Sequence, residues 1–204
     1  MLRVGLTGGV ACGKSTVGRM LAECGAHYLQ ADTLAHQLYA PGEATYYAVI
    51  EHFGRDILNP DGSINRRLLA NIAFPGRIAE LNAIVHPAVV EAQNRWMEDV
   101  QRTHPEGVAI VEAALLIEAG ASRDFDRLIV VTCNFEQKVA RYAQRAGLSR
   151  EEALVEVQRR SAAQMPDNEK ASRADYLIDN SASIEETSRQ VDVVWAGLRK
   201  NPAH

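Results

Sequence analysis

The sequence lacks any hydrophobic run of the length that a membrane helix needs. Crossing a bilayer takes about 20 consecutive apolar residues, and no stretch of the 204 residues approaches this length. The chain starts directly with a short apolar strand pattern, so we expect no signal peptide. These absences predict a protein that does not bind or insert into a membrane.

Cysteine and excess positive charge are also scarce. The three cysteines, Cys12, Cys24 and Cys133, are odd in number and lack metal-ligand spacing, which favours a reducing compartment and a cytoplasmic protein. A net charge of −4 argues against a general nucleic-acid binder, although a local basic patch stays open. With 47% hydrophobic and 24% charged residues and no internal repeat, the chain reads as one globular domain with elaborations.

The N-terminal segment carries the clearest motif. Residues 8–15 spell G-x-x-x-x-G-K-S between an apolar strand (2–6) and a helical pattern (14–23), which is the signature of a phosphate-binding loop, or P-loop. Its backbone amides cradle phosphates, its lysine reaches the β- and γ-phosphates, and its serine ligates Mg²⁺. The residues expected to bind ATP are Gly9, Ala11, Cys12, Gly13, Lys14, Ser15 and Thr16, with Ser15 as the metal ligand. The alternative is a glycine-rich turn with an ordinary lysine.

A short strand at 27–30 ends just before Asp32. Ligands of open α/β sheets bind at the carboxyl ends of strands, so Asp32 is a candidate general base close to the transferred phosphate. The alternative is that Asp32 is the N-cap of a helix over 33–39.

Residues 33–105 read as an all-helical insertion. Helices are expected at 44–53, 64–74, 78–85 and 88–102, with breaks at Pro75-Gly76 and at His86-Pro87. In a P-loop kinase such an insertion holds the acceptor. Its most informative polar residues are Arg66, Arg67 and His86, for which solvated surface positions are the alternative.

The strand at 108–112 ends in Glu112, in a pattern similar to a Walker B strand whose carboxylate holds Mg²⁺ through water. Glu118 follows as a second acid, and a surface charge is its alternative role. A fourth strand is expected at 127–132, and Asn134 with Gln137 predicts a capping box at the start of the next helix.

On that helix Arg141 and Arg145 lie four residues apart and therefore on one face. Two neighbouring cations repel each other unless an anion sits between them, which suits a lid that clamps phosphates; the alternative is a solvated basic face. A second capping box, Ser149 with Glu152, starts a helix to about 163. A fifth strand at 176–178 places Asn180 at its carboxyl end, where it would border the nucleotide base.

The elements follow the order β-α-β-(helical insertion)-β-α-β-(helix pair)-β-α, which predicts a doubly wound, five-stranded parallel α/β sheet of the P-loop NTPase class. We expect a single kinase unit over 1–204. It divides into a nucleotide-binding core (1–32, 106–134 and 171–204), an acceptor subdomain (33–105) and a lid (135–170).

The chain resembles the dephospho-CoA kinase family over nearly its whole length. The resemblance is carried by the P-loop segment 5–17, by Ala31-Asp32, and by an ordered series of later positions: Phe53-Gly54, Asp61-Gly62, Ile64, Arg66, Leu69, Phe74, Leu81-Asn82, Val85-His86-Pro87, Leu115-Leu116, Glu118, Gln137, Arg141, Arg145, Ala163-Gln164, Lys170, Ala174-Asp175 and Ile178-Asp179-Asn180.

The resemblance implies that ATP phosphorylates the ribose 3′-hydroxyl of 3′-dephospho-CoA, giving CoA and ADP in the last step of CoA synthesis. Carried over residue by residue, it makes Asp32, Lys14 and Arg141 catalytic and adds Arg145 and Asn180 to the ATP-binding set. It makes Asp32, Arg66, His86, Leu115 and Glu118 substrate-binding. The implied partners are two small molecules, ATP and dephospho-CoA, bound by a monomer or weak homo-oligomer, with neither nucleic acid nor membrane.

Several positions depart from the family pattern. Gln30 replaces a frequent acid, which leaves Asp32 as the sole carboxylate there, and Glu112 and Ala114 stand where Asp and Pro are common. Ala11 and Cys12 replace the usual Gly and Ser of the loop. Because Cys12 adjoins a helix N-terminus, where thiol pKa values fall, we expect it to be sensitive to oxidation.

Other readings stay open on the residues alone. A kinase of the same architecture acting on a nucleoside, nucleotide or shikimate-like acceptor is the nearest. A GTPase switch would carry N-K-x-D and D-x-x-G motifs, and the sequence has neither. The intact Lys14, Ser15 and Asp32 argue against a catalytically silent CoA-binding module.

Overall fold

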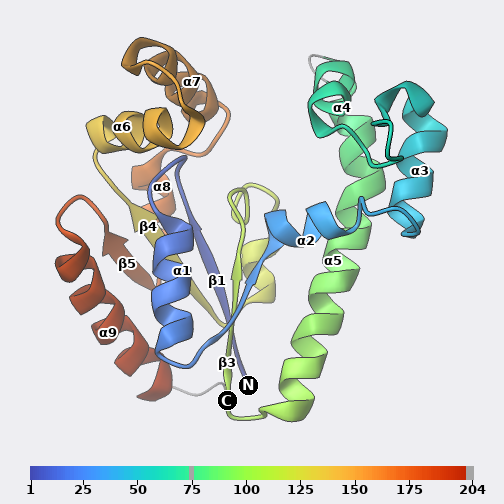
Figure 1. The fold of residues 1–204 in the computed structure, drawn as a ribbon. Helices are drawn as coiled ribbons and strands as arrows, with labels where there is room; N and C mark the ends of the chain where they lie inside the picture. The colour runs from blue at the N-terminus through green and yellow to red at the C-terminus, as the bar shows by residue number, and fades with distance from the viewer. Residues whose placement is uncertain (74–75, 201–204) are drawn as a thin grey trace. The chain divides into compact units, whose positions relative to one another are not determined.

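The computed structural model describes residues 1–73 and 76–200, and the chain divides into two compact units. The first unit comprises residues 1–30 and 100–204, and the second comprises residues 31–99 (Figure 1). The expected helix end at Phe74 and the break at Pro75 lie outside the described residues. Among the described helices, none combines the length and apolar character that a bilayer crossing demands.

The first unit is built on one five-stranded sheet. Its strands are β1 (Leu2–Gly8), β2 (His27–Gln30), β3 (Val108–Glu112), β4 (Arg127–Thr132) and β5 (Tyr176–Asp179). They pair in the order β2-β3-β1-β4-β5, and every pairing is parallel. The predicted fold class is therefore confirmed. Since all strands point the same way, their carboxyl ends lie along one edge of the sheet, which is where a doubly wound fold binds ligands.

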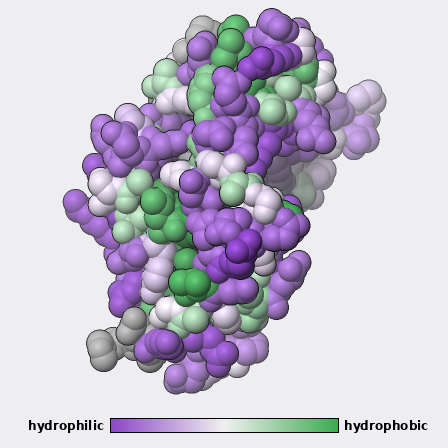
Figure 2. Space-filling model, turned by 90° about the vertical axis from the view of Figure 1, so that its left-hand side faces the viewer, coloured by the Kyte–Doolittle hydropathy of each residue, from purple (hydrophilic) through white to green (hydrophobic). Residues whose placement is uncertain are grey.

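Apolar side chains cover both faces of this sheet. One face is packed by α1 (Lys14–Glu23) and α9 (Ile184–Lys200), which contribute Val17, Leu21, Val191, Val194 and Leu198 to a core shared with β1, β3, β4 and β5. Side chains alternate along a strand, so Ile129 and Val131 of β4 enter this core, whereas Leu128 and Val130 pack with Leu116 and Ile117. The molecular surface that Figure 2 shows is mostly hydrophilic, with separate hydrophobic areas.

The segment between β4 and β5, which contains the predicted lid, has three helices: α6 (Phe135–Ala146), α7 (Arg150–Ala162) and α8 (Asp167–Ala171). The capping box of Ser149 and Glu152 is confirmed. The second predicted capping box, of Asn134 and Gln137, forms only in part. Asn134 accepts from the Gln137 backbone N–H, but the Gln137 side chain donates to the Ser181 carbonyl, and the Asn134 N–H is bound by the Ser181 hydroxyl instead. Ser181, which lies 44 positions after Gln137, thus replaces the local partner of the Gln137 side chain.

The connection from β3 to β4 is not the helix that was expected. It consists of turns and the short 3₁₀ helix η2 (Ala121–Asp124). The Ala113 N–H pairs with the Leu6 carbonyl, and Leu116 and Ile117 are buried against the sheet. These contacts hold the segment close to the strands without a helix.

The open edge of β5 is closed at its end by one side chain of α9. Gln190 accepts from the Asp179 N–H and donates to the Asp179 carbonyl, both over 2.9 Å. The side-chain amide thereby satisfies backbone groups that an edge strand otherwise leaves unpaired.

The second unit is helical, as expected. Its elements are α2 (Ala31–Gln37), α3 (Ala44–Phe53), η1 (Arg55–Ile57), α4 (Arg66–Ala73) and most of α5 (Ile78–Thr103). The break predicted at His86-Pro87 is wrong, because α5 runs through it. An internal proline costs a helix about 3 kcal/mol, and the burial of Leu81 and Val85 on one side of Pro87 and of Met97 on the other offsets this cost.

Candidate functional site

The P-loop joins β1 to α1 at the carboxyl edge of the sheet. Gly13 has a left-handed backbone (φ 95°) directly before the helix, a conformation that favours glycine. The Lys14 ammonium folds back over the loop and donates to the carbonyls of Gly8 (3.1 Å) and Gly9 (3.0 Å). The loop, the lysine and the helix N-terminus are therefore together in the arrangement that binds phosphates.

Ala11 and Cys12 behave differently from expectation. Ala11 has φ 53° and is the one non-glycine residue with a positive φ among those described, so the loop keeps a backbone shape that suits glycine. Cys12 is fully buried. Burial raises the pKa of its thiol despite the opposing charge of Lys14, so the argument that the helix terminus makes Cys12 a reactive thiolate is wrong.

Ser15 and Glu112 meet at the start of α1. The Ser15 hydroxyl donates to Glu112 Oε1 over 2.8 Å, while Glu112 Oε2 accepts from the Tyr28 hydroxyl and, at 3.3 Å, from the Gln30 amide. Burial and then the hydrogen bond to Glu112 raise the pKa of Tyr28 far above its usual range, so Tyr28 remains a donor. A hydroxyl beside a carboxylate is the hard-oxygen donor set that suits Mg²⁺.

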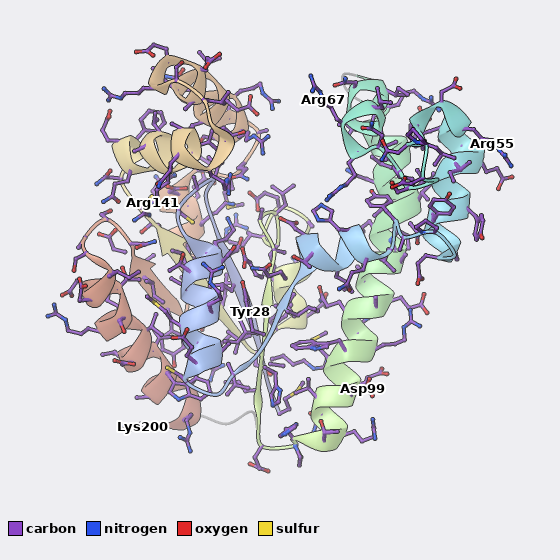
Figure 3. All side chains as sticks on the ribbon, in the orientation of Figure 1. Tyr28, Arg55, Arg67, Asp99, Arg141 and Lys200 are labelled. Atoms are coloured by element: carbon purple, nitrogen blue, oxygen red, sulfur yellow. The ribbon has the colours of Figure 1, made fainter. Side chains whose placement is uncertain are left out.

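Arg141 and Asn180 are hydrogen-bonded to the P-loop. Figure 3 labels the Arg141 side chain below α6. Both donate to the Cys12 carbonyl, at 3.3 Å and 2.8 Å, and Arg141 also donates to the Asn180 carbonyl at 2.9 Å. Arg145 lies elsewhere, with its guanidinium carbon 5.3 Å from the centre of the Tyr142 ring. Among the described residues, Arg141 is hydrogen-bonded to the loop, whereas the contact of Arg145 is with the Tyr142 ring.

Lys138 is a site residue that the sequence reasoning missed. Its buried ammonium pairs with Asp167, the first residue of α8, and both groups abut Gly9. A Cβ on Gly9 would lie 2.6 Å from Asp167 Oδ1 and 2.8 Å from Lys138 Nζ. A lysine next to a helix start ordinarily reads as a surface charge, so no local signal pointed to this position.

Glu118 and Leu115 lie after β3. Glu118 pairs with the fully buried Lys170 at 2.9 Å and accepts from the Met165 N–H. Partial burial opposes ionisation, but the bonds from Lys170 and Met165 outweigh it and lower the pKa of Glu118. Leu115 is 49% exposed. Glu118 is thus engaged with the protein itself, whereas Leu115 is open to a ligand.

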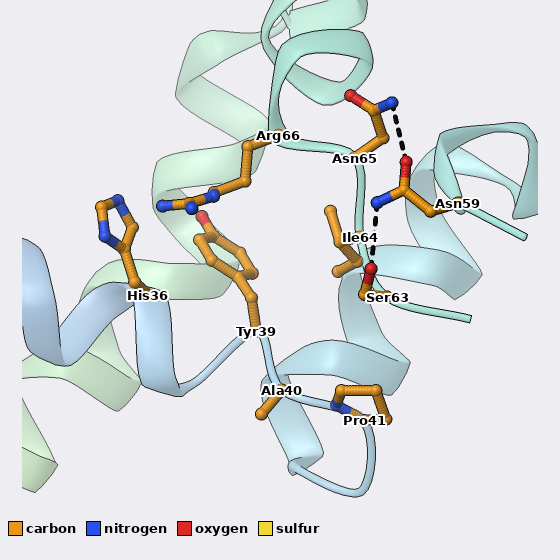
Figure 4. Close-up of a pocket in the computed structure, with 9 residues that line it drawn as sticks. All are labelled: His36, Tyr39, Ala40, Pro41, Asn59, Ser63, Ile64, Asn65 and Arg66. Atoms are coloured by element: carbon orange, nitrogen blue, oxygen red, sulfur yellow. Dashed lines mark hydrogen bonds between the residues drawn. The ribbon is translucent and has the colours of Figure 1, made fainter. Parts of the chain in front are cut away.

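The second unit has its own pocket of about 530 Å³ (Figure 4). Its lining comprises His36, Tyr39, Ala40, Pro41, Asn59, Ser63, Ile64, Asn65 and Arg66. Partial burial and then the Arg66 charge lower the pKa of His36, against the opposing influence of Asp32. Arg66 lines this pocket, whereas Arg67 and His86 are not among its lining residues; all three residues are exposed.

Asp32 lies in the first turn of α2, two residues after β2 ends. The helix begins at Ala31, so the alternative in which Asp32 is the N-cap is wrong, although a carboxylate in this turn still complements the helix dipole. Asp32 is exposed, and its carboxylate is available for chemistry.

A parallel five-stranded sheet, a G-x-x-x-x-G-K-S loop with its lysine in place, and an arginine of α6 bound to that loop define a P-loop kinase. A model of the family described as dephospho-CoA kinase matches residues 2–186. The chain belongs to the dephospho-CoA kinase family.

A curated relative agrees with this membership, and two solved structures share the fold. A dephospho-CoA kinase of Geobacter metallireducens is 42% identical over 205 residues, covering 99% of this chain and all of that protein. The crystal structure of TT1252 from Thermus thermophilus has a TM-score of 0.76 at 33% identity and covers 97% of both chains. A dephospho-CoA kinase from Campylobacter jejuni shares the fold, with a TM-score of 0.69 at 24% identity over 97% of both chains.

Proposed function

We propose that this chain transfers the γ-phosphoryl group of ATP to the ribose 3′-hydroxyl of 3′-dephospho-CoA, forming CoA and ADP in the final step of coenzyme A biosynthesis. The hydroxyl oxygen forms a bond to the γ-phosphorus, the bond from that phosphorus to the β–γ bridging oxygen breaks, and ADP leaves. The observation that carries the proposal is the assembled P-loop of a family member, with Lys14 and the Ser15–Glu112 pair in place.

Asp32 is proposed to accept or orient the proton of the acceptor hydroxyl. Asp32 follows the carboxyl end of β2 by two residues, and open α/β sheets bind their ligands at the carboxyl ends of the strands. Lys14 and Arg141 supply positive charge to the phosphates, which carry the charge of the loose transition state. The amides of Gly9 to Thr16 hold the β-phosphate, and Arg145 and Asn180 complete the ATP-binding set.

Ser15 and Glu112 fit a Mg²⁺ ion, because the structure pairs a hydroxyl with a carboxylate at the carboxyl end of β3. When bound, the ion neutralises charge on the β- and γ-phosphate oxygens. Ser15 would hold it directly and Glu112 would orient its shell, so both side chains prepare the nucleotide for transfer.

The pocket of the second unit is proposed to hold part of the acceptor. Its volume suits a fragment of a nucleotide-sized ligand, and Arg66 offers a planar cation suited to phosphate. His86 and Leu115 are proposed as further acceptor contacts, since both are exposed. Glu118 is proposed to act through Lys170, by fixing the segment that carries Leu115.

The setting of this reaction is proposed from composition. The three free cysteines support a reducing, cytoplasmic compartment. The chain is proposed to act on its two small-molecule substrates as a monomer or weak homo-oligomer, which sedimentation of the purified protein tests.

The reaction is tested by measuring ADP release in a coupled assay with five acceptors: dephospho-CoA, AMP, CMP, adenosine and shikimate. We expect turnover with dephospho-CoA to exceed the others by orders of magnitude. A preference for any other acceptor would overturn the proposal, and Lys14→Ala provides the control for background ATP hydrolysis.

A further inference from the structure

We propose that Tyr28 is a positioning residue for Glu112. With Gln30 it holds Glu112 Oε2, so that Oε1 stays turned toward Ser15, and it thereby sets the affinity of the site for Mg²⁺. This inference rests on the proposed role of Ser15 and Glu112 in holding the ion. Tyr28 itself does not touch nucleotide or metal in this scheme; it acts through the carboxylate.

The register of the sheet brings these three side chains together. Gln30 of β2 is paired with Glu112 of β3, so their side chains are neighbours on one face of the sheet. Tyr28 lies two residues earlier on the same face, and its long side chain reaches the diagonal neighbour. The Gln30 amide also donates to the Tyr28 hydroxyl over 2.8 Å, which completes a closed set of hydrogen bonds around Oε2.

A glycine in α1 makes room for the Tyr28 ring. A Cβ on Gly18 would lie 2.3 Å from Tyr28 Cζ and 2.6 Å from its hydroxyl oxygen, closer than atoms pack. Gly18 is buried in the middle of a ten-residue helix, where glycine costs about 1 kcal/mol relative to alanine. The close approach of the ring is a physical reason for this glycine, and it fixes the hydroxyl between α1 and Glu112.

Loss of the Tyr28 hydroxyl would leave Oε2 with the longer Gln30 contact at 3.3 Å. The carboxylate would then rotate more freely away from Ser15. Partners that orient a ligating group commonly change metal affinity by about 10- to 100-fold when removed. A positioning role therefore predicts weaker Mg²⁺ binding while the nucleotide itself still binds the loop amides.

The chain offers a matched control, because a second helix glycine faces a strand tyrosine. A Cβ on Gly197 of α9 would lie 3.0 Å from both Cε1 and the hydroxyl oxygen of Tyr176 on β5. Tyr176→Phe and Gly197→Ala therefore alter the same kind of contact at the β5 edge of the sheet, away from Glu112.

The test measures the dissociation constant of Mn²⁺, as a stand-in for Mg²⁺, from the complex of the full chain with ADP by electron paramagnetic resonance. Metal-free ADP affinity and thermal unfolding are measured alongside. We expect Tyr28→Phe and Gly18→Ala to raise the metal dissociation constant about tenfold, with metal-free ADP affinity within about twofold of wild type and Tyr176→Phe unchanged.

Two results would overturn the inference: an unchanged metal dissociation constant in Tyr28→Phe, or equal shifts in Tyr28→Phe and Tyr176→Phe, which would indicate general loosening. Glu112→Gln separates this failure from failure of the proposed metal site. If Glu112→Gln weakens metal binding and Tyr28→Phe does not, only the positioning role falls; if neither does, the metal site falls with it. The acceptor assay tests the reaction independently of both.

Discussion

The ammonium group of Lys138 is paired with the carboxylate of Asp167 against the backbone of the P-loop. The Lys138 side chain is 7% exposed and that of Asp167 is 32% exposed. The pair connects α6 and α8 to Gly9, whose carbonyl in turn accepts from Lys14. The packing of α6 and α8 and the shape of the loop are therefore linked through one ion pair.

Replacing Lys138 by Met is expected to lower the free energy of unfolding by about 2 kcal/mol. A fully buried pair that loses one partner costs about 3–5 kcal/mol, and the cost is smaller here because solvent partly reaches Asp167. Urea denaturation measures it. The exposed pair Arg150–Glu136 provides the control, since both side chains are 71% exposed and Arg150→Met should change little. Equal effects of the two substitutions would contradict the prediction.

Replacing Ala11 by Gly is expected to stabilise the protein by about 0.5 kcal/mol. Relief of the left-handed backbone gains about 1–2 kcal/mol, and the greater freedom of glycine in the unfolded chain removes about 0.5–1 kcal/mol. Ala140→Gly, at an exposed position within α6, is the control and should instead destabilise by about 1 kcal/mol. Thermal unfolding measures the stability of the two variants. If both Ala11→Gly and Ala140→Gly destabilise the protein, the backbone at Ala11 is unstrained.

Replacing Glu118 by Gln is expected to cost about 3 kcal/mol of stability, because Lys170 would be left buried without its counter-ion. Folding lowers the pKa of Glu118 below its ordinary 4.5, so the native state binds fewer protons than the unfolded state near that pH. The stabilisation is present above pH 4.5 and is lost as the pH falls through the folded-state pKa.

The difference in the free energy of unfolding between wild type and Glu118→Gln should therefore become smaller as the pH is lowered, which urea denaturation measures. The double variant with Lys170→Met should recover part of the loss, since an apolar replacement removes the unpaired charge. An unchanged stability together with a raised KM for the acceptor would mean that Glu118 contacts substrate instead.

Replacing Asp32 by Ala is expected to lower kcat by about 10²- to 10⁴-fold, the usual contribution of a positioned base. The fold should survive, because Asp32 is exposed in the first turn of α2. Asp56→Ala removes the same charge from an exposed position of the second unit and should leave kcat unchanged. Near-wild-type turnover in Asp32→Ala would reduce Asp32 to a residue that favours the helix start.

Arg66 and Arg67 offer a direct comparison of neighbouring arginines. Arg66 lines the pocket and Arg67 does not line it, so Arg66→Met should raise the KM for the acceptor at least tenfold by removing a charge-assisted contact. The KM for ATP should stay the same. Arg67→Met should change neither KM. Steady-state kinetics with each substrate varied in turn measure both values, and equal effects of the two substitutions would show that the assignment of Arg66 is wrong.

The parts of the fold that follow from local chemistry were predictable. The P-loop between β1 and α1 was predictable because its glycines and the flanking apolar runs lie close together in the sequence. The Ser149 capping box is equally local. The pattern of β3 indicates a metal-binding role for Glu112. Its contact with Ser15, 97 positions away, depends on the register of β1 and β3.

The misses share one physical cause, which is that distant packing outweighed local preference. Pro87 signals a helix end, yet core residues on both sides keep α5 continuous. The helix terminus lowers a thiol pKa, yet burial raises that of Cys12. Lys138 looks like a surface cation until α8, which has only five residues and was not predicted, supplies Asp167.

Gln190 also has a consequence for the protein outside its own fold. An unpaired strand edge is a template on which a strand of another molecule can add and begin an aggregate. At Asp179 that template is already taken, because the Gln190 amide binds both backbone groups from α9. A strand from another chain would have to displace this side chain before it could pair there, so a single glutamine helps to keep crowded copies of the protein from joining sheet to sheet.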